Sequence, residues 1–448
     1  MGVKRARTET TVPVKRARGK LNELPKLSGQ KLDVFAFGTG TICELGLGPE
    51  VTEVKRPRLS PLLPADEVGI VALAAGGAHS LAVDHEGQLW SWGQNDTGCL
   101  GRDTRLSDAE IDEDLDLNPK ESTPAKVTGI RSNISFVKVC ATDSASAALT
   151  PTGNVYAWGT FIDDGHKSFS AGVEIQYKPE RVPIQPKIVA LASGKDHFLA
   201  LTVDGHVYAW GVGTSFQLGV HVRSGRRTST AGPLRVPGVD NIVSIAAGDY
   251  TSYAIDSTGK VFSWGLNNFG QCGISDPVGP KACIETPTHA EFWDDKHIVQ
   301  IAAGGHHSLW LTKEGTMYTV GEINFNQLGV PIKELPENTV REQDGTPSYV
   351  PTPLELKWAS DEEEPVSLPK MKFIACGTDH NIALSQEDGS IWTWGFGSVY
   401  QLGHGKTGDD GPEEEEVPRH IRNTATKERN MVWAGAGGQY SITASVHV

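Results

Sequence analysis

The stretch ALAAGGAHSLAVDHEGQLWSWG at residues 72–93 decides the fold of this 448-residue chain. It places one turn at Gly76, a second at Gly87, and an aromatic residue before Gly93. A bulky residue followed by glycine recurs along the chain, at intervals of 55, 66, 52, 54, 56 and 74 residues. The seven pairs are Phe37-Gly38, Trp92-Gly93, Trp158-Gly159, Trp210-Gly211, Trp264-Gly265, Val320-Gly321 and Trp394-Gly395. Self-similarity at such a period is typical of repeat architectures.

Each unit predicts a small antiparallel sheet. Residues alternate between apolar and polar on both sides of Gly87, which indicates two half-buried strands joined by a tight hairpin. The apolar stretch before Gly76 supplies another strand, and a Pro-flanked stretch late in the unit supplies a fourth. We therefore expect a four-stranded sheet in each unit.

The two ends of the chain indicate how the sheets are arranged. The chain opens with a lone second half of the unit at 34–38 and closes with a lone first half at 436–448. Joining these halves closes a ring, so the sequence predicts an all-β seven-bladed β-propeller closed by pairing of N-terminal and C-terminal strands. Kelch repeats expect a Gly-Gly doublet in each blade, and WD repeats are shorter, so both propeller types fit less well.

Charge divides the chain into two predicted regions. The whole chain has a formal charge of −14, whereas residues 1–20 contain seven Lys or Arg and one Glu. We expect residues 1–30 to be a disordered basic tail and residues 31–448 to be the propeller. Two Lys-Arg-Ala-Arg motifs suit a nuclear-import signal, read by a nuclear-import receptor, or a clamp on the DNA backbone. Their basic residues are Lys4, Arg5, Arg7, Lys15, Arg16 and Arg18.

The sequence offers little for covalent or metal chemistry. Its six cysteines are spread singly with no C-x-x-C pair, which favours neither a zinc site nor a disulfide framework. No phosphate-binding loop of the Walker type and no nucleophile elbow occurs. No apolar run approaches the ~18 residues of a membrane-spanning helix, and no signal peptide is indicated, so we expect a soluble intracellular protein without cofactor or metal.

Function should lie where the blades differ on exposed loops. A histidine stands three positions after the first glycine in four blades, and we expect these histidines to bridge blades through the backbone. One or two positions after that glycine the blades diverge, and most of them place an acidic or imidazole side chain there. This set could attract a basic or phosphate-binding partner, although an Asp at a turn can also simply cap it. The bridging histidines are His79, His197, His307 and His380, and the divergent set is Asp143, Asp196, Asp249, His306 and Asp379.

Two further segments break the repeat. Residues 160–169 replace the expected Gln-Leu-Gly with two Phe residues around a polar tip, which suggests a hairpin that wedges into a partner, although repeat decay would also explain it. The segment 221–227 holds Arg223, Arg226 and Arg227 on an otherwise acidic body. Guanidinium groups bind planar acidic groups well, so this segment could bind an acidic partner. It could equally be a solvated loop without a partner.

Seven units with these motifs across residues 31–448 resemble the regulator of chromosome condensation family. Its founding activity is guanine-nucleotide exchange on the small GTPase Ran at chromatin. The resemblance implies exchange-critical roles for Asp196 and His306, and GTPase contacts for Asp143 and Asn268. It also implies that 160–170 is the wedge that presses on the GTPase, and that the arginine loop anchors on histones of the nucleosome. We add Asp249, Asp379, Phe161, Asp163 and Asp164 as GTPase-binding residues, and expect a nuclear, chromatin-associated protein.

Two alternatives stay open at this point. A propeller of this family can act as a binding scaffold on chromatin or in a ubiquitin-ligase complex, without exchange activity. Substitution of Asp196 and His306 distinguishes the two, because scaffold binding survives it. The plant ultraviolet-B receptor of the same fold uses Trp clusters in Gly-Trp-Arg-His-Thr motifs, and none occurs in this sequence. Most of the tryptophans here stand at strand positions, where core packing explains them.

Overall fold

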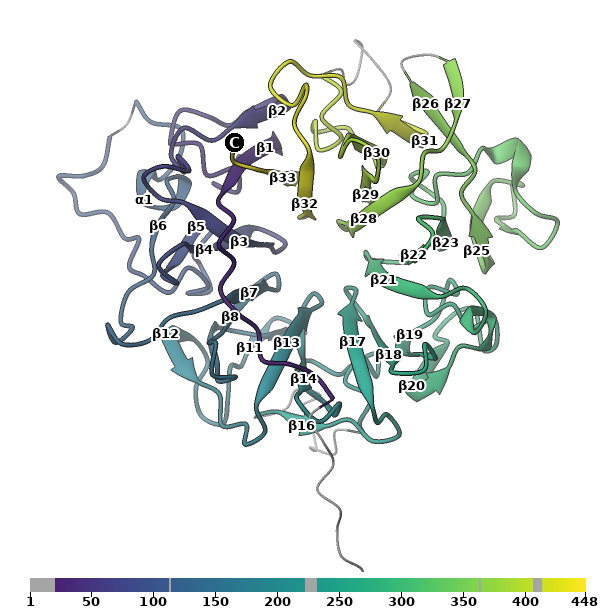
Figure 1. The fold of residues 1–448 in the computed structure, drawn as a ribbon, viewed down its shortest axis with the longest axis horizontal. Helices are drawn as coiled ribbons and strands as arrows, with labels where there is room; N and C mark the ends of the chain where they lie inside the picture. Colours follow the sequence, from purple (N-terminus) through teal and green to yellow (C-terminus); the bar gives the residue numbers. More distant parts are fainter. Residues whose placement is uncertain (1–20, 113, 222–231, 362–363, 406–412) are drawn as a thin grey trace, which may run out of the picture.

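A computed structural model describes residues 21–112, 114–221, 232–361, 364–405 and 413–448. Seven β-sheets stand around a central axis, with one strand of each sheet nearest to the axis (Figure 1). The predicted seven-bladed propeller is confirmed. Short helical turns occur only in connections of this described part: α1 (Pro119–Ser122), η1 (Glu291–Trp293) and η2 (Ile332–Glu334).

Five of the seven sheets have the predicted four strands. The first of them contains β3 (Ile70–Ala75), β4 (His79–Asp84), β5 (Leu89–Gly93) and β6 (Ala125–Lys126). The second contains β7 (Lys138–Ala141), β8 (Ala145–Leu149), β9 (Val155–Gly159) and β12 (Gln176–Arg181). The third contains β13 (Ile188–Ser193), β14 (His197–Thr202), β15 (Val207–Gly211) and β16 (Leu234–Arg235). The fourth contains β17 (Ile242–Ala247), β18 (Thr251–Asp256), β19 (Val261–Leu266) and β20 (Cys283–His289). A separate hairpin of β10 (Ile162–Asp163) and β11 (His166–Lys167) follows β9.

Two sheets are larger than predicted. One adds β24 (Val340–Arg341) to β21 (Ile298–Ala303), β22 (His307–Thr312), β23 (Met317–Glu322) and β25 (Pro347–Glu355). The other adds the hairpin β26 (Trp358–Asp361) and β27 (Glu364–Ser367) to β28 (Met371–Cys376), β29 (His380–Ser385), β30 (Ile391–Phe396) and β31 (Glu414–His420). The extra strands extend the outer edges, where unpaired backbone groups can accept additional strands.

The seventh sheet closes the ring from both ends of the chain. Its order is β2 (Glu53–Leu59), β1 (Leu32–Thr39), β33 (Tyr440–Val446) and β32 (Met431–Ala436). The register of β1 against β33 runs from Leu32↔Val446 to Gly38↔Tyr440. The predicted closure by terminal strands is confirmed.

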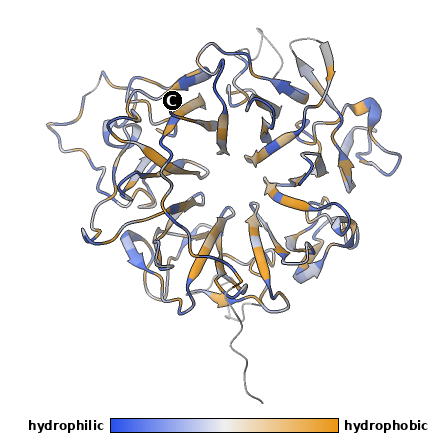
Figure 2. Cartoon of the chain, viewed as in Figure 1, coloured by the Kyte–Doolittle hydropathy of each residue, from blue (hydrophilic) through white to orange (hydrophobic). Residues whose placement is uncertain are grey.

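The core lies between adjacent blades. The second strand of a blade, such as β4, is buried at every residue, because neighbouring blades cover both of its faces. The prediction of a half-buried second strand is therefore wrong. Trp92, Trp158, Trp264 and Trp394 are at most 1% exposed, and Figure 2 shows hydrophobic residues concentrated on the strands. Core packing thus accounts for these four indoles.

The two faces of the ring differ in which turns they present. We call the face with the turns between first and second strands, such as 76–78, the rim face. The face with the turns between second and third strands, such as 85–88, is the opposite face. Residues 21–31 cross the front of the ring in Figure 1, and their contacts with turn residues place them on the opposite face.

Residues 21–30 precede the first strand of the propeller and contact its body. The backbone N–H groups of Leu21 and Asn22 donate to the Val203 carbonyl at 3.0 and 2.9 Å. The Asn22 amide Nδ2 donates to the carbonyls of Thr202 and Ile242 at 3.1 and 2.9 Å. Residues 1–20 lie outside the described part. No helix among the described residues is long and apolar enough to span a membrane.

Candidate functional site: the rim face

The repeat histidines connect adjacent blades and are not free for chemistry. Each is at most 1% exposed, and its Nε2 lies within hydrogen-bond distance of a side chain on the next blade. The pairs are His79–Ser146 at 2.8 Å, His197–Ser252 at 2.9 Å, His307–Asn381 at 2.7 Å and His380–Ser441 at 2.9 Å. The predicted bridging role is confirmed, but the partner is a side chain rather than the backbone.

The geometry of these bridges fixes the histidine tautomer. The Ser252 hydroxyl donates to the Gln217 carbonyl at 2.7 Å, so its oxygen accepts from the Nε2–H of His197. Burial lowers the pKa of His197 to about 3, so the ring is neutral at physiological pH. At the ring closure Tyr440 replaces the histidine, and its hydroxyl lies 2.9 Å from Ser80 Oγ. These bridges hold the turns of the rim face at a fixed spacing.

Carboxylates from four blades lie near one another on the rim face, because Asp249 interacts electrostatically with the other three. Asp143, Asp196, Asp249 and Asp379 are all partly buried, and we call them the acidic rim. A cavity of about 110 Å³ between the inner turns is lined by Asp143, Lys195 and Asp249 together with glycine turns. The structure therefore brings together predicted residues that are more than 200 positions apart in the sequence.

The acidic rim holds its protons more tightly than ordinary carboxyls do. Burial, with a contribution from the neighbouring Asp143 carboxylate, raises the pKa of Asp249 to about 7. Burial also raises the pKa of Asp143 and Asp379. Lys195 Nζ lies 3.9 Å from Asp143 Oδ2 and offsets part of this effect. A cationic partner would favour the ionised forms further.

Asp196 connects the acidic rim to the β10–β11 hairpin. Its Oδ1 accepts a hydrogen bond of 3.1 Å from the backbone N–H of Ile162. Burial raises the pKa of Asp196 to about 7 despite this bond. The side chain of Asp164 at the hairpin tip is exposed, and Asp163 is half-buried. The predicted hairpin therefore exists, and its base is held by a rim carboxylate.

Phe161 does not lie where a partner could touch it. Its ring is 1% exposed and stacks on Phe169, with centroids 6.1 Å apart and 2° between planes. It also meets Phe198 edge-to-face at 5.8 Å. The structure contradicts direct GTPase contact by Phe161, because the insertion needs an apolar side chain to anchor it to the core. The exposed part of the hairpin is its polar tip.

His306 stands beside the acidic rim in an aromatic setting. Its ring stacks on Tyr250 at 6.0 Å and 21°, and meets Phe269 edge-to-face at 5.1 Å. Burial and the nearby Lys195 ammonium lower the pKa of His306, which favours a neutral imidazole. Asn268 is half-buried, and its Oδ1 accepts a 2.8 Å hydrogen bond from Gln271 Nε2. Both residues thus have fixed surroundings on the rim.

Two residues at the rim had no role in the sequence analysis. Lys195 Nζ lies 5.8 Å from the Tyr250 ring centroid and 3.9 Å from Asp143 Oδ2, so it places a positive charge next to the acidic rim. Glu322, next to Gly321, has a pKa raised to about 7 by burial and by the Asp379 carboxylate. Lys195 shares the divergent register with the acidic residues, so that register could have identified it. No repeat position signals Glu322.

The other predicted sites cannot be placed. Arg223, Arg226 and Arg227 lie outside the described residues, as do the six basic residues assigned to nuclear import. Within the described ranges, no group of three or more His, Cys, Asp or Glu side chains is arranged to hold a metal ion. The rim therefore offers carboxylates, an imidazole and an amide for recognition of a partner surface.

Comparison with known proteins identifies the family. The model of the RCC1-like domain matches residues 33–443. The chain belongs to the RCC1-like domain family. This confirms the predicted relation to the regulator of chromosome condensation.

One curated relative and two solved structures, all from yeast, match nearly the whole chain. The sequence is 42% identical to guanine nucleotide exchange factor SRM1 from Saccharomyces cerevisiae, over 94% of this chain and 88% of that protein. The crystal structure of Prp20p from the same organism, described with its binding properties to Gsp1p and histones, has a TM-score of 0.84 at 40% identity, covering 95% of this chain and 93% of that one. Yeast RCC1 (Prp20) bound to Kap60 has a TM-score of 0.86 at 39% identity, covering 100% of this chain and 97% of that one.

Proposed function

We propose that this protein is a guanine-nucleotide exchange factor for a Ran-type small GTPase. The observation that supports this most directly is the acidic rim with its attached hairpin, in a chain 42% identical to an exchange factor over 94% of its length. The protein forms no covalent bond with its substrate. It binds the GTPase so that the nucleotide-free form is stabilised.

Linkage makes the exchange reversible, and the nucleotide pool sets its net direction. A partner that weakens nucleotide binding must itself be bound more weakly when nucleotide is present, by the same factor. The protein therefore accelerates release of either nucleotide, and the more abundant GTP then fills the site. Asp196 and His306 are the exchange-critical residues of this proposal. Asp143, Asp249, Asn268, Asp379, Asp163 and Asp164 supply the surrounding contacts.

Histones and an import receptor complete the set of partners. Prp20p is described with its binding to histones and Gsp1p, and yeast RCC1 (Prp20) has been crystallised with Kap60. We infer a nuclear, chromatin-associated protein. In finer detail, Arg223, Arg226 and Arg227 bind histone carboxylates, while the basic residues of 1–20 bind an import receptor or the DNA backbone.

The test measures release of a fluorescent GDP from a purified Ran-type GTPase, with catalytic amounts of the full chain. We expect Asp196→Ala and His306→Ala to slow release by at least tenfold. Asp204→Ala is the matched control, because Asp204 is exposed at a turn of the opposite face in the same blade as Asp196.

The result distinguishes exchange from scaffolding. Fast release with wild type and the Asp204 control, and slow release with the rim variants, supports exchange at the rim. If the wild-type protein binds the GTPase but does not accelerate GDP release, the protein is a binding scaffold and not an exchange factor.

A further inference from the structure

Three consecutive blades place charged side chains at one register of the rim face. The second residue of the rim turn is Asp143, Lys195 and Asp249 in the blades that begin with β7, β13 and β17. The other four blades have uncharged residues at this register, namely Gly77, Gly305, Thr378 and Gly438. Lys195 is therefore the one cation of this register, and it stands between two carboxyl residues.

The backbone of Lys195 is fixed from both neighbouring blades. Its carbonyl accepts a hydrogen bond of 2.9 Å from the Asp143 N–H, and its own N–H donates to the Asp249 carbonyl at 3.3 Å. All three residues line the small cavity of the rim face. The side chain of Lys195 thus starts from a backbone that is held in place, which restricts the positions its ammonium can reach.

The ammonium of Lys195 lies between the carboxylates and the aromatic residues of the rim. Its Nζ is 3.9 Å from Asp143 Oδ2 and 5.8 Å from the centroid of the Tyr250 ring. The Tyr250 ring stacks on the His306 ring, with centroids 6.0 Å apart. A cation near an aromatic face is attracted to the ring, so Lys195 favours the ring position that supports His306. One side chain therefore links the carboxylates to the imidazole.

The positive charge of Lys195 favours the ionised form of three rim carboxyls. Burial raises the pKa of Asp143, Asp196 and Asp249, and the nearby ammonium offsets part of each rise. The carboxylates oppose this effect, because they repel one another and because Asp163 adds a further negative charge. Lys195 therefore increases the negative charge that the rim carries at neutral pH.

The same charge has the opposite effect on the imidazole. Burial lowers the pKa of His306, and the Lys195 ammonium lowers it further. Lys195 thus keeps His306 neutral while it keeps the neighbouring carboxyls ionised. Removal of the ammonium should change both groups together.

We propose that Lys195 is a positioning residue for GTPase recognition. Its ammonium keeps the acidic rim charged toward a cationic GTPase surface and holds the Tyr250 ring beside His306. This inference rests on the proposed function, because it assigns Lys195 a role in exchange at the same rim.

The first experiment measures release of a fluorescent GDP from a purified Ran-type GTPase between pH 6 and 8.5. The full chain is used as wild type, Lys195→Met and Lys195→Arg, since methionine keeps much of the side-chain length without the charge. We expect Lys195→Met to raise the pH midpoint of exchange by about 1 unit, because each carboxyl loses a neighbouring opposite charge. Lys195→Arg restores the charge and should keep the wild-type midpoint.

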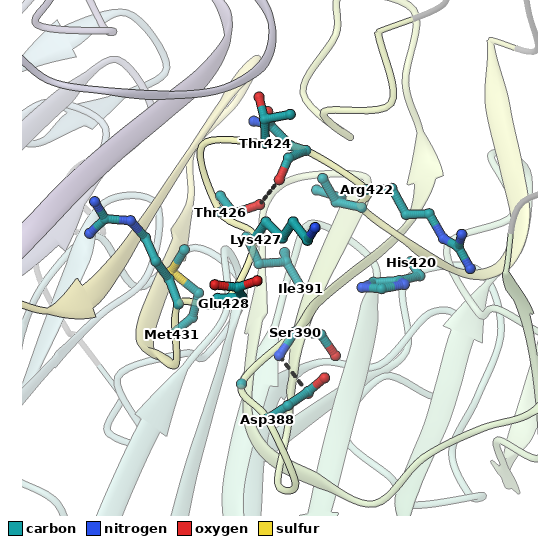
Figure 3. A pocket seen from close by; sticks show the side chains of 14 residues that line it. Asp388, Ser390, Ile391, His420, Arg422, Thr424, Thr426, Lys427, Glu428 and Met431 are labelled. Atoms are coloured by element: carbon teal, nitrogen blue, oxygen red, sulfur yellow. Dashed lines mark hydrogen bonds between the residues drawn. The ribbon is translucent and has the colours of Figure 1, made fainter.

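Lys427→Met is the matched control. Lys427 is exposed and lines a cavity of about 500 Å³ together with Asp388 and Ser390 (Figure 3). The turn glycine Gly389 lines the same cavity, which places it on the opposite face. This control removes the same net charge away from the rim, and all variants act on the same GTPase. A midpoint shift in Lys195→Met alone supports the proposal.

The second experiment does not require a GTPase. Asp196 and Asp249 have pKa values of about 7, so at pH 5 they are mostly protonated in the folded protein and at pH 8 they are mostly ionised. Loss of the ammonium should therefore lower the urea midpoint of unfolding more at pH 8 than at pH 5. If this difference is present but wild type does not accelerate GDP release, the proposed function fails and Lys195 serves only the charge balance of the rim.

Three results would overturn the positioning role in a protein that is active in exchange. A loss of exchange by the same factor at every pH in Lys195→Met indicates a direct contact or a general defect. Equal midpoint shifts in Lys195→Met and Lys427→Met mean that only net charge matters. A urea midpoint that falls equally at pH 5 and pH 8 shows that Lys195 does not control the ionisation of the rim.

Discussion

Replacing Glu44 by glutamine should stabilise the protein at neutral and alkaline pH. Glu44 is 1% exposed, and its Oε2 accepts a 2.9 Å hydrogen bond from the Ile42 N–H. Four other blades place a glutamine in this register, where Oε1 accepts from the N–H two residues earlier. These are Gln217, Gln271, Gln327 and Gln401, at 2.8, 2.9, 2.8 and 3.0 Å. The buried carboxyl of Glu44 therefore accepts the same backbone hydrogen bond that the glutamine amide accepts in the other four blades.

The size and sign of the effect follow from the pKa. Burial raises the pKa of Glu44 from 4.5 to about 7. Because the folded pKa lies above the unfolded one, the folded state keeps a proton that the unfolded chain releases between pH 4.5 and 7, and stability falls with rising pH in that window. At ~1.4 kcal/mol per pH unit, the full penalty above pH 7 is about 3 kcal/mol. The amide has no such penalty.

Urea unfolding at pH 5 and at pH 8 measures this difference. We expect Glu44→Gln to change the free energy of unfolding little at pH 5 and to raise it by up to about 3 kcal/mol at pH 8. Gln401→Glu is the converse control, since it introduces a carboxyl at the same register and should lose stability as pH rises. A gain of equal size at both pH values, or a loss at pH 8, would refute the argument that a buried ionised carboxyl causes the cost.

Two further predictions concern the ring closure and the acidic rim. Tyr440→Phe removes a buried hydroxyl that accepts a hydrogen bond from Ser80 Oγ and shares its one proton between the carbonyls of Gly76 and His79, so it should cost about 2 kcal/mol of unfolding free energy. Tyr253→Phe removes a single bond, to one carbonyl, and should cost about 1 kcal/mol. Equal losses in urea unfolding would contradict the special role of the closure. With pKa values of about 7, Asp196 and Asp249 are partly protonated at neutral pH, so affinity for a GTPase surface that binds through cations should rise from pH 6 to 8, by up to tenfold per unit for each carboxyl that ionises. Titration calorimetry in buffers of different ionisation enthalpy should detect the released protons, and an affinity independent of pH with no proton release would be inconsistent with this account.

The repeat made the ring predictable because identical spacing requires identical sheets. Seven bulky–glycine pairs and two complementary half-units determined the number of blades and the closure of β1 on β33. The divergent turn register likewise predicted which side chains meet at the rim. These predictions succeeded because the inter-blade contacts depend on residues at the same register in successive copies.

Features without a repeat could not be predicted in the same way. Residues 21–30 look like a polar tail, yet Asn22 bonds to carbonyls 180 and 220 positions away. Phe161 is predicted to contact the GTPase because it belongs to the insertion that breaks the repeat, and only its packing against Phe169 and Phe198 shows that it anchors the insertion. The extra strands β24, β26 and β27 arise in long connections whose sequence has no counterpart in other blades.

The turns explain how one fold can vary its partner surface without losing its shape. Asp196 lies immediately before His197, and His306 immediately before His307, so a rim residue and a bridging residue are neighbours in sequence. Each histidine fixes the backbone through the next blade, while the residue before it faces the rim. A substitution at Asp196 therefore changes the charge of the rim while the bridge from His197 to Ser252 remains. The propeller can thus keep its inter-blade hydrogen bonds constant and place partner recognition one residue away from them.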